Sequence, residues 1–417
     1  MKRPALVLLC SALWAALAGP ASGQSYRTFQ EEWARVQKAR IRLGPFYIFP
    51  LLSLLNLGYD DNVYFESKGR GDYTANIVAE AKAYCPLGRW ILLSARDAPE
   101  YSFYLHEKNR REFANSYSYG AKALLFGRFV LSGNYQYEKH RGPLSSEIGS
   151  LVTGETKGFD AGLAFETARK TSLNLTVFQR NIAVENFRLE DVTAPLSSAF
   201  NRREKGLTLE FNYPLFYEGF LFVSAGYVEY AFAAAGSAWR DSKAVSVSGG
   251  LRFPLTGNLR GTLALGYKKF TLKTGPFPSF SGLIVRTELE GRFGRFGIRL
   301  LYRRDNPFSF YQDVVYFIEN DYGGGISLYL TAFLSLAYNY EYGLGDYAEF
   351  FIRNPETGEE VAVRRRDRHR SNSVGLVFRI FTSIDFGLSW NEIRWTSSLP
   401  GWDRRRRVIS AYLSQRF

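Results

Sequence analysis

Residues 244–253 read AVSVSGGLRF, and residues 259–268 read LRGTLALGYK. In both stretches, small or polar residues alternate with apolar or aromatic ones, so the apolar side chains share one face of an extended strand. The intervening PLTGN, residues 254–258, has the composition of a turn. The sequence therefore predicts a β-hairpin with one apolar face, and the spacing of an amphipathic helix fits neither stretch.

The same alternation recurs along most of the chain, for example at residues 334–342, 373–380 and 408–417. Eight short turns separate such segments, at residues 86–89, 126–128, 168–171, 215–219, 255–258, 294–295, 331–333 and 382–383. Nine longer polar connections lie between them, the largest at residues 141–157, 183–203, 231–243 and 346–370. Short turns on one side and long loops on the other are typical of outer-membrane barrels.

These connections predict an all-β fold, a transmembrane antiparallel up-and-down β-barrel of about 18 strands with both termini at the periplasmic end. A barrel of 16 strands is the alternative, because residues 178–185 and 314–322 show the alternation weakly. The composition agrees, since 34 Phe and 27 Tyr accompany 38 Gly and 22% charged residues. In a barrel, apolar residues facing lipid alternate with polar residues facing the lumen.

The N-terminus predicts export. Lys2 and Arg3 precede an apolar stretch, residues 5–18, and the small residues ASG follow at 21–23. This arrangement is typical of a signal peptide. The expected domains are a signal peptide at residues 1–23, a periplasmic segment with helical spacing at 24–42 and an outer-membrane β-barrel at 43–417.

The last strand carries a second mark of this class. Ile409, Ala411, Leu413 and the terminal Phe417 share one face of residues 408–417. A terminal aromatic residue preceded by apolar residues at alternate positions resembles the signal that the barrel-assembly machinery recognises. We therefore expect that machinery as a partner.

The first predicted strand carries a family resemblance. Residues 43–63 read LGPFYIFPLLSLLNLGYDDNV, and the end of this segment contains Gly58, Tyr59, Asp60, Asp61 and Asn62. It resembles the opening of the putative β-barrel porin type 2 family. The resemblance implies an outer-membrane barrel associated with exopolysaccharide production or export, with polysaccharide export components as partners.

Alternation also assigns charged side chains to the lumen, where they are candidates for setting solute selectivity. The candidates are Arg252, Arg260, Lys268, Arg286, Arg292, Arg299, Arg379, Glu288, Glu290 and Asp385. Cations exceed anions, and a basic lumen would concentrate anionic solutes. The alternative is that these residues pair across neighbouring strands and only keep the lumen hydrated.

Two arginine clusters account for much of the net charge of +13. One spans residues 364–370, in a predicted external loop, and the other spans 404–407. They predict either a collar that attracts an anionic solute or acidic polysaccharide, or contact with outer-membrane lipids and lipopolysaccharide. We favour the second, because arginine binds phosphate as a bidentate donor. No nucleic-acid partner is expected, since no recognisable binding module accompanies the charge.

Other classes find little support. After the signal peptide only Cys85 remains, which excludes a fold held by intrachain disulfides. The three histidines, His106, His140 and His369, lie in predicted loops or at their edges, and no catalytic or metal-ligand motif includes them. No cofactor and no metal is expected. The prediction is a porin-like channel for small polar or anionic solutes or saccharides, followed by a non-conducting structural or surface-interaction barrel and, third, an outer-membrane enzyme.

Overall fold

The computed structural model describes residues 26–142, 147, 152–184, 200–215, 219–256, 258–274, 278–309, 314–348, 350–353, 360–381, 383–399 and 401–417. The predicted signal peptide, residues 1–23, lies outside the described residues.

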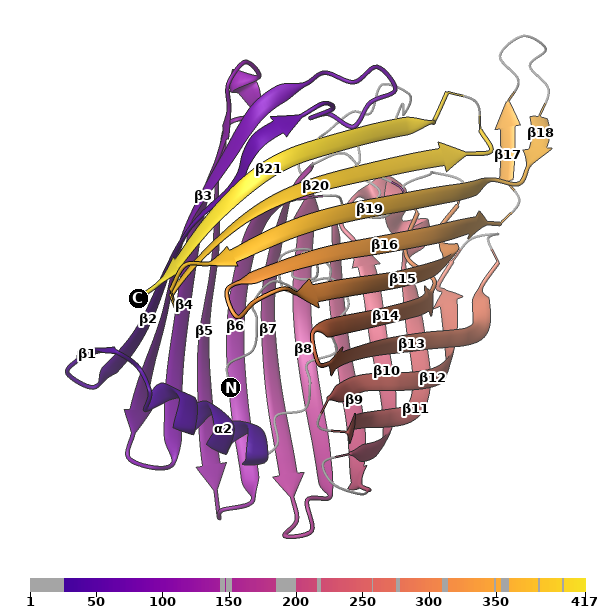
Figure 1. Ribbon diagram of the computed structural model, residues 1–417. Helices are drawn as coiled ribbons and strands as arrows, with labels where there is room; N and C mark the ends of the chain where they lie inside the picture. The colour runs from indigo at the N-terminus through magenta and orange to yellow at the C-terminus, as the bar shows by residue number, and fades with distance from the viewer. Residues whose placement is uncertain are drawn as a thin grey trace.

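The described residues form a closed antiparallel barrel (Figure 1). Its strands are β2 (Phe46–Asp60), β3 (Asp72–Leu87), β4 (Ile91–Tyr104), β5 (Glu112–Leu125), β6 (Phe129–Gly142), β7 (Val152–Glu166), β8 (Ser172–Val184), β9 (Arg202–Pro214), β10 (Phe220–Phe232), β11 (Ser242–Thr256), β12 (Leu259–Leu272), β13 (Phe280–Phe293), β14 (Phe296–Asp305), β15 (Phe317–Tyr329), β16 (Leu334–Tyr347), β19 (Arg366–Arg379), β20 (Ile384–Ser397) and β21 (Arg404–Arg416). Each pairs with the next, and β2 pairs with β21 to close the barrel. The prediction of about 18 strands is confirmed for this part of the chain, and most of each weakly patterned region belongs to a strand, residues 178–184 to β8 and residues 317–322 to β15.

The remaining described elements lie at the two ends of the barrel. Helix α2 (Tyr26–Val36) precedes a short strand, β1 (Ile41–Leu43), which pairs with the start of β2. The connections at the opposite end contain two short 3₁₀ helices, η2 (Lys108–Arg110) and η3 (Ala235–Arg240), and a hairpin of β17 (Phe350–Arg353) and β18 (Glu360–Val363). No helix among the described residues is long and apolar enough to cross a membrane.

The eight predicted short turns all coincide with connections at the end where α2 lies. The extent predicted for the large loops was wrong, because the strands continue into them. Strand β7 begins at Val152 and β19 at Arg366, inside the predicted loops 141–157 and 346–370. Strand pairing continues there while the apolar alternation does not, since only the lipid-contacting part of a strand needs an apolar outer face.

The two faces of the wall differ as the alternation predicts. On β12, Leu263, Leu265 and Tyr267 are exposed, whereas the intervening Ala264 and Gly266 are partly covered. In a membrane protein the exposed apolar face contacts lipid. The opposite face of the strands therefore borders the lumen, and it is the face that α2 contacts.

Candidate functional site: the barrel interior and its mouths

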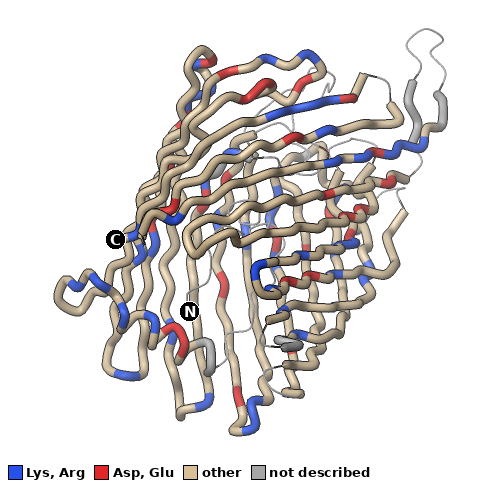
Figure 2. Tube along the Cα trace, in the orientation of Figure 1, with Lys and Arg blue, Asp and Glu red and all other residues tan. Residues whose placement is uncertain are grey.

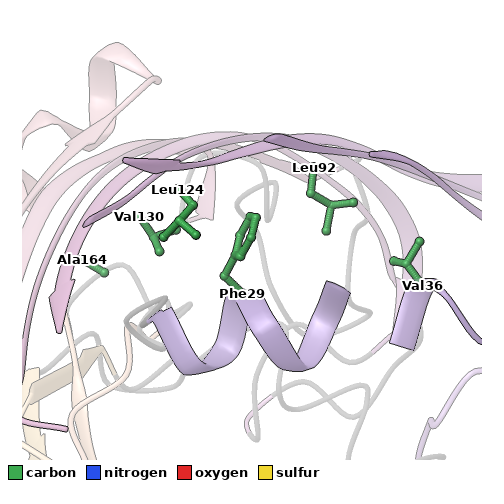
Figure 3. Packing of buried hydrophobic residues seen from close by; sticks show 6 residues of the cluster. All are labelled: Phe29, Val36, Leu92, Leu124, Val130 and Ala164. Carbon is green, nitrogen blue, oxygen red and sulfur yellow. The ribbon is translucent and has the colours of Figure 1, made fainter. Parts of the chain in front are cut away.

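Helix α2 lies against the inner wall of the barrel. Figure 3 shows the sheet arching over the helix, with Phe29 and Val36 pointing towards it. Both side chains are buried, and they pack with four inward residues of successive strands, Leu92, Leu124, Val130 and Ala164. The helix forms this contact because Phe29, Trp33 and Val36 recur at helical spacing and share one face.

An ion pair adds to this packing. Glu32 on α2 accepts a hydrogen bond from Lys122 on the inner face of β5. Leu124 and Val130 flank the short turn between β5 and β6, so the helix occupies the mouth formed by the short turns. In outer-membrane barrels the short turns are periplasmic, and we call this opening the periplasmic mouth.

Strand register places all ten predicted lumen residues on the inner face, and most of them pair across strands. Arg252 reaches Glu210 at 2.7 Å, and Lys268 reaches Asp305 at 2.8 Å. The other ion pairs are Arg260 with Glu290 at 2.5 Å, Arg299 with Glu288 at 3.6 Å, and Arg379 with Asp385 at 3.2 Å. Much of the inner wall is therefore polar but locally neutral. The role of these residues in selectivity stays a prediction.

Arg286 and Arg292 differ from the other cations of this set. Neither has an acidic side chain within ion-pair distance among the described residues. Arg286 is exposed and lies in register with another cation, Arg303. The Arg292 guanidinium stacks 4.1 Å from the centre of the Tyr329 ring. These two residues leave positive charge on the inner wall that no local carboxylate neutralises.

The opposite mouth is narrowed by the connection between β14 and β15, which the sequence did not predict. Phe308 lies inside the barrel, with ring centroids 5.0 Å from Tyr230, 5.2 Å from Phe232 and 5.6 Å from Phe270. Because Tyr230 and Phe232 belong to β10, this connection crosses the inner side of the intervening strands β11 to β13. Aromatic packing therefore holds it within the mouth.

Arg240 of η3 fixes the same connection from a neighbouring loop. Its buried guanidinium donates to the carbonyl oxygens of Ser309 at 2.6 Å and Val314 at 3.3 Å. The Ser309 hydroxyl donates to buried Glu147, which belongs to the connection between β6 and β7. Burial lowers the pKa of Arg240 to about 10, so the guanidinium stays charged at neutral pH. Three connections thus meet across the mouth.

We expect Arg240→Ala to loosen this constriction. Each lost hydrogen bond from a charged donor is worth about 1.5–3 kcal/mol, and two carbonyl groups would lose their donor. The variant should pass larger uncharged polyethylene glycols than the unmodified barrel in a liposome-swelling assay. Lys243→Ala, on the outer face of β11 nearby, is the control and should leave the size limit unchanged. An unchanged size limit in Arg240→Ala would show that the guanidinium does not hold the mouth closed.

The family motif lies at the seam where β2 meets β21. The Asp60 carboxylate, which is buried, accepts hydrogen bonds from Arg406 Nε at 2.9 Å and Nη2 at 2.6 Å. Asn62 donates to the carbonyl of Arg405 at 2.8 Å, and Asp61 accepts from the backbone amide of Arg407 at 2.6 Å. A side chain at Gly58 would meet the Ile409 carbonyl oxygen at 1.9 Å. The motif therefore joins the first and last strands of the barrel, and Tyr59 packs against Tyr73 beside it.

Asp60→Asn is expected to destabilise this seam. The amide keeps the shape of the carboxylate but leaves Arg406 without its counter-charge in a buried place, which costs about 2–4 kcal/mol in the free energy of unfolding. Urea unfolding of the barrel refolded into liposomes measures this loss. The more exposed pair Arg260 and Glu290 offers a control, since Glu290→Gln should cost under about 1 kcal/mol. Equal losses in both variants would contradict a special role for the seam.

The predicted assembly signal lies on the outer face of β21. Ile409, Leu413 and Phe417 are exposed at 62%, 44% and 48%, and Ala411 lies between them on the same face. Their recognition by the assembly machinery stays a prediction.

One group on the inner wall has the composition of a metal site. Ligand atoms of Glu319, Asp321 and His369 lie within 4.8 Å of one another. The guanidinium of Arg303, however, donates to Glu319 at 2.9 Å and to Asp321 at 2.6 Å. A cation already bound to both carboxylates opposes a metal ion there, and we interpret the group as an ion-pair network.

The closed barrel and its polar interior define an outer-membrane β-barrel of the porin kind. The chain belongs to the family described as "Putative beta-barrel porin 2", whose model matches residues 36–417. The predicted family and the predicted outer-membrane location are thereby confirmed. No curated protein matches the sequence.

Two solved structures share the fold. OccK9 (OpdG) of Pseudomonas aeruginosa is 13% identical with a TM-score of 0.51, and the match covers 89% of this chain and 98% of that one. The pyoverdine outer membrane receptor FpvA of Pseudomonas aeruginosa PAO1, bound to pyoverdine, is 11% identical with a TM-score of 0.51, covering 91% and 66%. The chain spans 58% of the matched chain in the FpvAI–pyocin S2 complex.

Proposed function

We propose that this porin-like barrel passes small polar or anionic solutes, saccharides among them, and that its passage serves exopolysaccharide export. The observation that carries the proposal is the inner wall, which is polar and extensively ion-paired and which carries positive charge at Arg286 and Arg292 outside any ion pair among the described residues. A polar wall keeps water in the lumen, and barrels of this strand number are wide enough to hold a channel. The two uncompensated cations favour anions.

A non-conducting barrel is the second candidate, and a specific observation favours it. Helix α2 covers part of the periplasmic mouth, and the connection carrying Phe308 narrows the other. If both stay in place, the barrel would act as a structural or surface-interaction protein. We propose no catalytic step for either candidate.

Planar-bilayer recording distinguishes the two. We expect the refolded chain to show stable single-channel steps with a preference for chloride over potassium, and acidic oligosaccharides to reduce the current more than neutral ones of equal length. Folded barrels that insert without conductance would overturn the channel and favour the second candidate. Conductance that acidic oligosaccharides do not reduce would support the channel but contradict the passage of acidic saccharides.

The export link needs a cellular measurement. Deleting the gene in its host should lower the amount of secreted polysaccharide while the amount held in the periplasm rises. Restoration by the unmodified chain, but not by an Arg286→Glu, Arg292→Glu variant that still folds, would tie the export to the lumen. Unchanged secretion would separate this barrel from polysaccharide export.

A further inference from the structure

The two arginine clusters are divided between the faces of the barrel. Within 404–407, Arg404 and Arg406 point inward, since Arg404 lies over the rings of Trp395 and Trp402 and Arg406 binds Asp60. Arg405 and Arg407 are exposed on the outer face. The same division occurs within residues 364–370, where buried Arg365 and Asp367 form an ion pair and the arginines at 366, 368 and 370 are exposed. Strand alternation therefore brings part of each cluster to the outside.

The register aligns these outward arginines into one surface. Arg370 of β19 is paired with Arg394 of β20, which is paired with Arg405 of β21. Neighbouring strands lie about 4.8 Å apart, so the row spans about 10 Å. Figure 2 shows the basic residues gathered over the ends of these three strands, opposite the end that carries the C-terminus. We call Arg368, Arg370, Arg394, Arg405 and Arg407 the outer arginine row.

Little negative charge accompanies this row. Glu392 accepts hydrogen bonds from Arg405 and Arg407. Among the residues that the structure describes, no carboxylate lies within ion-pair distance of Arg368, Arg370 or Arg394. Like charges directly opposite one another on a sheet are destabilising, so the row is suited to an anion supplied from outside the protein.

The residues below the row show where that anion would lie. Two positions from Arg370, Arg394 and Arg405 the outward residues form a mixed row of Asn372, Glu392 and Arg407. Four positions away they are Val374, Trp390 and Ile409, and the next row is Leu376, Leu388 and Ala411. Each strand position advances about 3.4 Å, so Arg370, Arg394 and Arg405 stand about 14 Å above the first apolar row and Arg407 about half as far. Tyr338 and Tyr340 on β16 flank the same levels. From the loop end inwards the outer surface is first basic, then contains aromatic side chains and then becomes apolar, as at the boundary between water and membrane.

We propose that the outer arginine row binds the phosphate groups of a phosphorylated glycolipid of the outer leaflet, whose acyl chains lie along the apolar rows below. Arginine suits this ligand, because its planar fork donates two parallel hydrogen bonds to a phosphate. The apolar rows select a lipid over a free phosphate or a soluble acidic saccharide, which would gain nothing from them. The site faces outward and is separate from the proposed passage, so it does not depend on conductance.

The test uses bisphosphorylated lipid A as the probe, added to the full-length barrel in detergent and counted by native mass spectrometry. Arg370→Gln with Arg394→Gln removes two charges from the row and should weaken binding by at least about tenfold. The matched control is Lys243→Gln with Lys269→Gln, which removes two exposed outward charges from β11 and β12 and should change binding by less than about twofold. Lipid A freed of both phosphates should bind the unmodified barrel and the arginine variant equally weakly.

A third variant is expected to bind lipid A more tightly, a result that misfolding would not produce. Glu392→Gln removes the carboxylate that competes for Arg405 and Arg407, so the affinity for bisphosphorylated lipid A should rise. Compact migration on unheated gels would show that each variant folds. Equal binding of phosphorylated and dephosphorylated lipid would overturn the site, because the phosphates would then contribute nothing. An equal loss in the lysine control would overturn it as well and show only general attraction of an anionic lipid. Inorganic phosphate competing at millimolar concentration would overturn the role given to the acyl chains.

Discussion

Introducing carboxylates at Phe29 and Val36 is expected to raise the single-channel conductance of the barrel about twofold or more, because the helix would leave the wall. Both side chains are buried against Leu92, Leu124 and Val130. Burying an unpaired carboxylate in such a contact costs several kcal/mol, more than the remaining ion pair of Glu32 with Lys122 supplies. Displacement of α2 would widen the open cross-section of the periplasmic mouth, because the helix occupies part of it. Bilayer recording of Phe29→Asp, Val36→Asp measures the change.

The exposed Gln30 on the same helix provides the matched control. Gln30→Asp adds a carboxylate without disturbing the packed face, so conductance should stay within the spread of the unmodified protein. A double variant with unchanged conductance would mean that α2 does not limit the current, and the narrowest point would then lie at the mouth held by Phe308 and Arg240.

Reversing the two uncompensated lumen cations should reverse ion selectivity. Arg286→Glu with Arg292→Glu changes the lumen charge by four units at sites that carry no local counter-charge. Fixed charge on the wall of a narrow pore sets the local concentration of small ions, so the chloride-to-potassium permeability ratio should fall about fivefold or more. Reversal potentials in a salt gradient give this ratio directly.

The control exchanges a neutral pair. Arg260→Glu with Glu290→Arg exchanges the two members of an ion pair whose charged atoms lie 2.5 Å apart in the unmodified chain, and it leaves the sum of their charges unchanged. Its permeability ratio should remain near that of the unmodified chain. If the exchange alters the ratio as much as the reversal does, the detailed positions of paired charges would matter more than the net charge of the wall.

The alternation predicted the barrel because a strand that separates lipid from water must repeat with a period of two. The lipid-facing parts of the strands around Leu263 and Ile409 follow it, so both the strand count and the inward assignment of residues such as Arg252 could be derived from the sequence. The pairing of Arg252 with Glu210 could not, because a cross-strand partner depends on register, and register is fixed by turns and bulges rather than by the alternation itself.

The connections that narrow the mouth opposite the periplasmic one have no periodic pattern in the sequence. Phe308, Ser309 and Arg240 belong to irregular connections whose partners are distant in the sequence and whose geometry is set by the finished wall. A cluster of Phe and Tyr in a polar loop was the one available signal. The alternation likewise failed at Arg366 to Arg370, where the strand rises above the lipid and both faces are polar.

The ion pair between Asp60 and Arg406 at the seam of β2 and β21 has a consequence for how the barrel closes. Its two residues are 346 positions apart, and β2 is interrupted beside this contact by a register shift between Leu54 and Leu57 and a positive φ at Asn56. A closure slipped by two residues would still pair backbone with backbone, but it would separate Asp60 from Arg406 and drive the Gly58 backbone away from its close fit at Ile409. The barrel can close only after its last strand has been synthesised. These few side chains then favour the native register of β2 with β21 over a register shifted by two residues.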